Sequence, residues 1–271
     1  AFFELIKISI GTSNNDFDFS LLTDKDWFNV LEESKKQAAV LLCFDALKNI
    51  EHKPNAELYH KWFLLAAANI KCNINIIKEQ DALTALLNDN KIPYVILKGV
   101  SSAHYYPDSN IRSLGDIDFI VDESYLEKTK ELLLSSGYQL DDDTSSIHYE
   151  LSRNKVRIEL HRTISGIPRN KFADYFSSQV SLFCDNNVLE GNFSRPCDYH
   201  HAIIIFLHTL HHLLHNGIGI RHLCDWACFV QATQNDAFWT EKFIPLLKKT
   251  GTYNFMCGLT LTSVQLLGIN R

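Results

Sequence analysis

Two strand-like runs with acidic side chains constrain this chain more than any other feature of its sequence. Residues 116–121 have the composition of a strand, so Asp116 and Asp118, two positions apart, lie on one face of it. Residues 156–161 alternate polar and apolar side chains and place Glu159 opposite their apolar side chains. If the two strands are neighbours in a sheet, three carboxylates converge. Such a cluster is costly to desolvate and usually binds a divalent metal ion.

Residues that can bind an anion precede the acidic pair. They are Lys98, Gly99, Ser101, Ser102 and Arg112. A glycine lets the backbone approach a phosphate group closely, serines at a helix start can bind one, and the two cations offset its charge. Each also has a structural interpretation: Lys98 as an ion-pair partner of Asp116 or Asp118, the serines as a helix cap, and Arg112 as an ordinary surface residue.

Together these residues predict a Mg²⁺ site for phosphoryl or nucleotidyl transfer, with Asp116, Asp118 and Glu159 as metal ligands and catalytic groups. Glu159 would complete a second metal position and help to deprotonate the acceptor hydroxyl. His161 shares the face of Glu159. It orients either that carboxylate or a substrate hydroxyl, and a half-buried structural histidine is the other interpretation. The alternative for the acidic pair is two solvated side chains at a strand end.

The order of these motifs resembles the DNA polymerase beta-like nucleotidyltransferase superfamily, and more closely a bacterial family called uncharacterised nucleotidyltransferases. The motifs that carry the resemblance, within residues 94–161, are Leu97-Lys98-Gly99, Tyr106 with Arg112, Gly115-Asp116-Ile117-Asp118, and Glu159-Leu160-His161. The resemblance implies transfer of a nucleoside monophosphate from a nucleoside triphosphate, with ATP as the expected donor and Mg²⁺ or Mn²⁺ as the metal. It implies nucleotide-binding roles for Lys98, Gly99, Ser101, Ser102, Arg112 and His161.

One departure from the superfamily pattern keeps alternatives open. Val100 follows Gly99, where the superfamily usually has Gly-Gly or Gly-Ser. A binding module that kept the fold and lost turnover is therefore one alternative, although the intact carboxylates favour an enzyme. A toxin–antitoxin-type nucleotidyltransferase that acts on tRNA ends or on a partner protein is another.

Charge and composition narrow the class of acceptor. The 271 residues have a formal net charge of −6, so the chain has no overall attraction for long nucleic acid, and a small-molecule, peptide or protein acceptor is favoured. The seven cysteines, an odd number, predict reduced, buried side chains. Without a secretory signature or an apolar run of membrane-spanning length, we expect a cytoplasmic protein that does not bind membranes. The sequence carries no signal for an oligomeric state.

The pattern of apolar residues predicts an α+β fold, in which a small mixed β-sheet core is flanked by helical regions. We divide the chain into an N-terminal helical region (1–92), a nucleotidyltransferase core (93–165) and a C-terminal helical region (166–271). The expected helices are 25–48, capped by Thr23 and Asp26, then 56–89, 122–136, capped by Ser124 and Glu127, and about 172–182, 198–215, 219–233, 237–250 and 253–267. The expected strands begin near 94, 117, 147 and 156, and the last two form a hairpin.

Four histidines fall on one face of a predicted helix. They are His208, His211, His212 and His215, at positions i, i+3, i+4 and i+7. They form either a metal site, with Asp225 as a further ligand, or a structural and pocket-lining cluster hydrogen-bonded to Asp225. Phosphate contact by protonated rings is a further interpretation. We favour the structural or pocket-lining role. Cys224 and Cys228 are one turn apart but lack a second cysteine pair, so no zinc site is predicted there.

Overall fold

A five-stranded mixed sheet lies at the centre of the fold. The computed structural model describes residues 1–14, 16–168 and 171–270. The strands are β1 (Tyr94–Ile96), β2 (Ile117–Val121), β3 (Gln139–Asp142), β4 (His148–Arg153) and β5 (Val156–His161), in the order β1-β2-β5-β4-β3. β2 and β5 are parallel, and the other neighbours are antiparallel. The α+β class and the β4–β5 hairpin are confirmed, whereas β3 was not predicted.

Helices precede the sheet, as expected, but one predicted helix is broken. The N-terminal helices are α1 (Phe2–Ile10), α2 (Asp24–Lys36), α3 (Val40–Ala46) and α4 (Ala56–Asp89). The Thr23–Asp26 capping box that starts α2 is present. The continuous helix predicted over 25–48 is wrong, because Ala38 adopts a left-handed conformation with φ of 53° and the N–H of Ala39 donates to the Ser34 carbonyl. This pattern ends α2 and redirects the chain into α3.

The remaining helices lie between the strands of the sheet, as the first two of them do, or follow it. They are α5 (Val100–Ala103), α6 (Leu126–Ser135), α7 (Ala173–Val180), α8 (Asp198–His215), α9 (Ile220–Ala232), α10 (Ile244–Thr250), preceded by a π-helical turn at Phe238–Phe243, and α11 (Tyr253–Leu267). A second hairpin, β6 (Asn187–Glu190) and β7 (Phe193–Pro196), was not predicted. The capping box predicted at Ser124 and Glu127 is wrong. The Asp122 carboxylate instead accepts the backbone N–H of Ser124 at 3.0 Å, and a 3₁₀ turn precedes α6.

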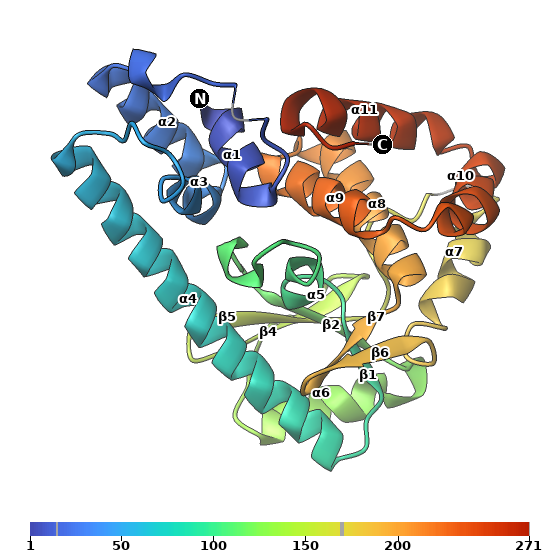
Figure 1. Cartoon of the computed structure of the whole chain (residues 1–271). Coiled ribbons are helices and arrows are strands. Elements are labelled where there is room, and N and C mark those ends of the chain that lie inside the picture. The colour runs from blue at the N-terminus through green and yellow to red at the C-terminus, as the bar shows by residue number, and fades with distance from the viewer. Residues whose placement is uncertain (15, 169–170, 271) are drawn as a thin grey trace.

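Two hydrophobic cores hold these elements together, and α4 contributes to both. The first combines the N-terminal and C-terminal helices and includes the fully buried Trp62 of α4. The second lies under the sheet and includes Leu83 and Leu87 of α4. Figure 1 shows α4 running along one side of the molecule, from the N-terminal helices to the sheet, and α1 beside α11. The division at residues 92 and 165 stays a prediction.

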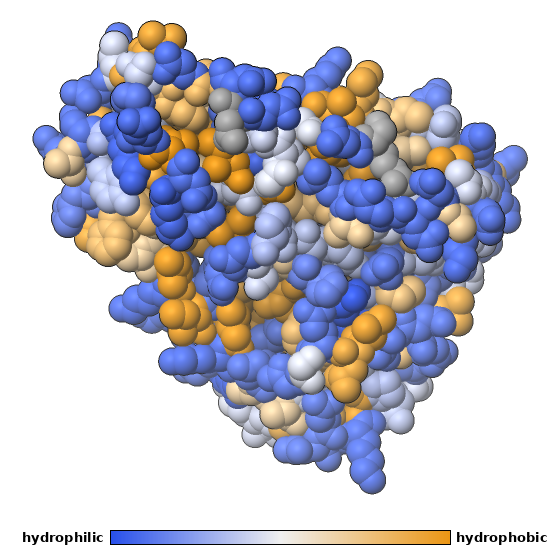
Figure 2. Space-filling model, viewed as in Figure 1, coloured by the Kyte–Doolittle hydropathy of each residue, from blue (hydrophilic) through white to orange (hydrophobic). Residues whose placement is uncertain are grey.

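The surface is largely polar, with apolar side chains gathered along α4. Figure 2 shows hydrophobic atoms over this helix, where Phe63, Ile70 and Ile74 are exposed. Among the described residues, no helix combines the length and apolar character needed to span a bilayer. The seven cysteines are free. The expectation that they are buried is wrong for Cys72 and Cys257, which lie exposed on α4 and α11.

Candidate active site

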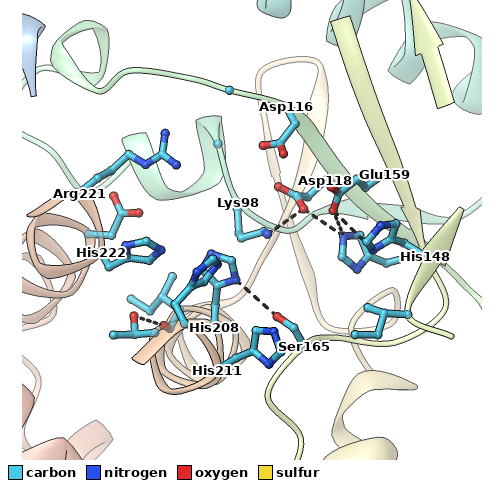
Figure 3. Close-up of a pocket in the computed structure, with 18 of the residues that line it drawn as sticks. Lys98, Asp116, Asp118, His148, Glu159, Ser165, His208, His211, Arg221 and His222 are labelled. Atoms are coloured by element: carbon cyan, nitrogen blue, oxygen red, sulfur yellow. Dashed lines mark hydrogen bonds and ion pairs between the residues drawn. The ribbon is translucent and has the colours of Figure 1, made fainter. Parts of the chain in front are cut away.

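The parallel pairing of β2 with β5 brings the predicted carboxylates together. Asp118 lies opposite Glu159 in the register of the two strands, and Asp116 immediately precedes β2. All three line one pocket of about 340 Å³. Figure 3 shows their side chains on one side of this pocket. The two runs therefore place the three carboxylates along one pocket, and their role as metal ligands stays a prediction.

Asp118 is the most buried of the three carboxylates, at 3% exposure. Its Oδ1 lies 2.8 Å from the Lys98 ammonium and 3.0 Å from Nε2 of His161. Burial alone would raise the pKa of Asp118, but these two partners more than offset it and hold the pKa well below its usual range. The ion pair expected between Lys98 and the acidic pair is thus formed with Asp118. Asp118 therefore carries a negative charge at neutral pH.

Glu159 is held by two histidines, one of which also contacts Asp118, and Asp116 is held by an arginine. His161 Nε2 lies 3.3 Å from Glu159, and burial, which would lower the pKa of His161, is outweighed by its hydrogen bonds to Asp118 and Glu159, so this pKa is raised. His148 approaches Glu159 at 3.6 Å. Arg157 pairs with Asp116 at 2.7 Å. His161 therefore contacts Glu159, which one of its interpretations predicted, and also Asp118, which none did; its contact with a nucleotide stays a prediction.

A tight turn places the Lys98 side chain beside the carboxylates. Gly99 has φ of +62° and ψ of −112°, a conformation that strains any residue with a Cβ. A Cβ there would lie 3.7 Å from the Asp116 carbonyl. Ser101 donates its hydroxyl to the Ile96 carbonyl at 2.5 Å, and Ser102 is also buried. Neither serine side chain lines the pocket, and their contact with a nucleotide stays a prediction.

Arg112 is buried, so its interpretation as a surface residue is wrong. Its guanidinium donates two hydrogen bonds of 2.8 Å to the two carboxylate oxygens of Asp225, and Tyr106 donates its hydroxyl to the same carboxylate at 2.7 Å. Burial would raise the pKa of Asp225, but Arg112 outweighs it and lowers this pKa. The expectation that Asp225 is a hydrogen-bond partner of the histidines is also wrong, because Arg112 and Tyr106 occupy it. Arg112 still lines the pocket.

Histidines form the opposite wall of the pocket. Figure 3 shows His208 and His211, from α8, facing the carboxylates across Lys98, with Arg221 and His222 from α9 beside them. His212 completes this wall. His222 was missed in the sequence, because it lies on another helix and outside the i, i+4 pattern.

The histidines of this wall are mostly uncharged. Burial lowers the pKa of His222 to about 4 and that of His208 well below its usual range. Burial also lowers the pKa of His212. Neutral imidazoles attract phosphate weakly, so the phosphate contact considered for protonated rings is disfavoured at neutral pH.

Comparison with known proteins identifies the family. The family described as uncharacterised nucleotidyltransferase matches residues 23–268. The chain belongs to this family. It is therefore a nucleotidyltransferase, a transferase of phosphorus-containing groups. A search of curated proteins finds no match to the chain.

The carboxylates of this nucleotidyltransferase suit a hard divalent cation. Mg²⁺ prefers oxygen ligands and is usually bound by one or two carboxylates together with substrate phosphates. Asp116, Asp118 and Glu159 offer such oxygens at the wall of one pocket, and their charges are balanced by Lys98, Arg157 and His161. The type of donor atom therefore suits Mg²⁺ or Mn²⁺. Among the described residues, the groups whose ligand atoms all lie within 4.8 Å of one another include Glu159 but neither Asp116 nor Asp118.

Proposed function

We propose that this nucleotidyltransferase uses Mg²⁺ or Mn²⁺ to transfer a nucleoside monophosphate, with ATP as the expected donor, to a hydroxyl group of its acceptor. The observation that carries the proposal is the pairing of Asp118 with Glu159 across two parallel strands, beside the Lys98-Gly99 turn. This order of motifs also supports membership of the DNA polymerase beta-like superfamily. The family match supports nucleotide transfer as the class of reaction.

The carboxylates and the turn have separate roles in this proposal. Asp116, Asp118 and Glu159 would hold the metal, and a bound Mg²⁺ supplies positive charge that stabilises the triphosphate as it reacts. Lys98 now pairs with Asp118 at 2.8 Å, and its ammonium can turn to a phosphate oxygen when that carboxylate acquires another partner. Gly99 leaves the backbone free to approach the phosphates. Catalysis would then rest on positioning and on charge, without a covalent nucleophile.

Glu159 is the residue we assign to the acceptor hydroxyl. Its carboxylate contacts His161 at 3.3 Å and His148 at 3.6 Å, so its orientation is set by two rings. A carboxylate fixed in this way can accept the hydroxyl proton as the new ester bond to the α-phosphorus forms and the bond from that phosphorus to the departing pyrophosphate breaks. His161 is the positioning residue in this step, and it holds Asp118 with its same nitrogen.

The charges of the pocket favour a small-molecule, peptide or protein acceptor over tRNA. Four cations line it: Lys98, Arg112, Arg157 and Arg221. The first three are paired with Asp118, Asp225 and Asp116 respectively. The whole chain is also acidic, at −6. A phosphate backbone needs a continuous run of uncompensated cations, and the described residues of this pocket do not offer one.

The test is release of pyrophosphate from nucleoside triphosphates, screened against acceptors with Mg²⁺ and with Mn²⁺. We expect Asp118→Asn to lose the metal-dependent release seen with the parent chain, because an amide is a weaker ligand than a carboxylate. Asp122→Asn is the matched control. Asp122 directly follows the last residue of β2 and caps a 3₁₀ turn. Asparagine caps such a turn equally well, so this variant should keep the local structure. Equal turnover by Asp118→Asn and the parent would refute the assignment, and nucleotide binding without turnover by the parent would favour the binding module.

A further inference from the structure

Three histidines from two helices meet in the wall of the pocket opposite the carboxylates. His208 and His212 are one turn apart on α8, and their ring centroids are separated by 4.5 Å. His222, near the start of α9, lies 5.3 Å from the first ring and 4.7 Å from the second. One nitrogen of each ring lies within 4.8 Å of a nitrogen of each of the others.

We propose that His208, His212 and His222 bind a divalent transition-metal ion, of which Zn²⁺ is the test case. Imidazole nitrogens suit zinc and its neighbours, whereas Mg²⁺ prefers oxygen. Zinc binds histidine nitrogens at about 2.0–2.1 Å. Small rotations of the three side chains would bring the nitrogens to that distance from one point. This site is separate from the carboxylate site and does not depend on the proposed reaction.

A close contact between the chain after β5 and α8 orients His208. The hydroxyl of Ser165 lies 3.4 Å from Nδ1 of this ring, so Nε2 is the nitrogen left for a metal. The next residue, Gly166, lets the chain approach α8 this closely. Its φ is +83°, and a Cβ at this position would lie 2.1 Å from the Leu207 carbonyl oxygen. Histidines that bind metals commonly engage their second nitrogen with such a partner, which fixes the ring.

The charge state of the three rings also suits a metal. Burial lowers the pKa of each, so they are neutral near pH 7, which is the form that binds metals. Two cations act on these rings: Lys98, which is paired with Asp118 at 2.8 Å, and Arg221 of α9. The pairing partly offsets the repulsion of an incoming ion by Lys98 but not that by Arg221. His211 and His215 contact each other along α8 with their rings tilted by 31° and centroids 4.4 Å apart, and they do not belong to the group of three.

The position of the site indicates that a bound zinc ion would keep one coordination position open. Zinc sites with three protein ligands keep a fourth position for water or substrate, whereas structural sites are closed by four protein ligands. All three histidines line the same pocket as Asp118 and Glu159. The open place would therefore face the cavity in which the acceptor meets the nucleotide.

The experiment measures Zn²⁺ binding to the full chain by competition with a chromophoric chelator, without nucleotide. The variants are His212→Gln and His222→Gln, and His211→Gln is the matched control on the same helix and pocket. We expect each of the first two to weaken the site by more than the ~10- to 100-fold that loss of an outer partner costs. His211→Gln should bind as the parent does. Unfolding of the zinc-free variants, followed by circular dichroism, verifies that they are folded.

A second group, His148, Glu159 and His161, also brings its ligand atoms within 4.8 Å, so Glu159→Gln is included. We expect Glu159→Gln to retain the zinc that His212→Gln loses. The proposal is overturned if Glu159→Gln loses that zinc while His212→Gln and His222→Gln keep it. It is also overturned if the folded His212→Gln and His222→Gln variants bind zinc as tightly as the parent, if the parent binds none, or if His211→Gln is equally impaired. Because the readout is binding, failure of the proposed transfer reaction would leave it unaffected.

Discussion

Paired charges stabilise the residues around the pocket. Arg112 is buried and the Asp225 side chain is only 12% exposed. The two form two hydrogen bonds with each other, and Tyr106 donates to the same carboxylate. A buried ion pair gains little over an apolar pair of the same shape, but removing one partner leaves a desolvated charge. This pair joins the segment before β2 to α9, and so it fixes one wall of the pocket relative to the other.

We predict that Arg112→Met lowers the free energy of unfolding by about 3–5 kcal/mol, because the Asp225 carboxylate stays buried without its partner. The double variant Arg112→Met with Asp225→Leu should recover part of this loss. Urea unfolding of the two variants and the parent measures both effects. A loss below about 1 kcal/mol for the single variant would show that the pair is solvated in solution.

At the scale of single elements, the connection between α2 and α3 stores strain. Ala38 adopts a left-handed conformation with φ of 53°, where its Cβ is crowded. We predict that Ala38→Gly stabilises the protein by about 0.5–1 kcal/mol, measured by thermal or urea unfolding. Ala39→Gly is the control, because Ala39 is buried with φ of −111° and should lose stability. If both variants destabilise equally, the strain at Ala38 is not present.

Elements with regular alternation were predictable, and elements set by distant contacts were not. The β4–β5 hairpin and the meeting of Asp118 with Glu159 follow from period-two patterns in the sequence. The short strands β3, β6 and β7 have no such apolar pattern, and the side chains of β3 and β6 are mostly exposed. The break after α2 depends on a left-handed residue other than glycine, which no local residue type indicates.

The local sequence could not predict which polar side chains of the site pair with each other. Arg112 meets Asp225 across 113 positions of the chain. His222 joins His208 and His212 only because α9 packs against α8. In each case the individual residue types were visible in the sequence, and the packing of helices decides which of them meet.

At the scale of the whole molecule, buried neutral histidines make the fold sensitive to acid. His201 is 1% exposed between the rings of Tyr105 and Phe229, and neither of its ring nitrogens has a hydrogen-bond partner among the described residues. Burial lowers its pKa to about 3. The unfolded chain takes up a proton near pH 6.5 and the folded chain does not, so this stability is present above pH 6.5 and lost as the pH falls.

We predict that His201→Phe flattens this dependence while keeping the packing against Tyr105 and Phe229. Between pH 6.5 and pH 5, the parent should lose on the order of 2 kcal/mol more than the variant, because one proton fewer is linked to unfolding. Urea unfolding at several pH values measures the difference between the two proteins. His161, whose pKa is raised, acts in the opposite direction but equally in both. Parallel pH profiles would contradict a neutral, buried His201.

The sheet, α8 and α9 line one pocket, and we propose that its carboxylates bind the metal–nucleotide complex. The most direct measurement is calorimetric titration of ATP into the full chain, with and without Mg²⁺. In the parent and in Asp122→Asn, we predict that Mg²⁺ tightens ATP binding on the order of 10-fold or more, as a charged contact of about 1.5–3 kcal/mol implies. In Asp118→Asn, this tightening should be lost. Mg²⁺-dependent tightening of the same size in Asp118→Asn would contradict the account.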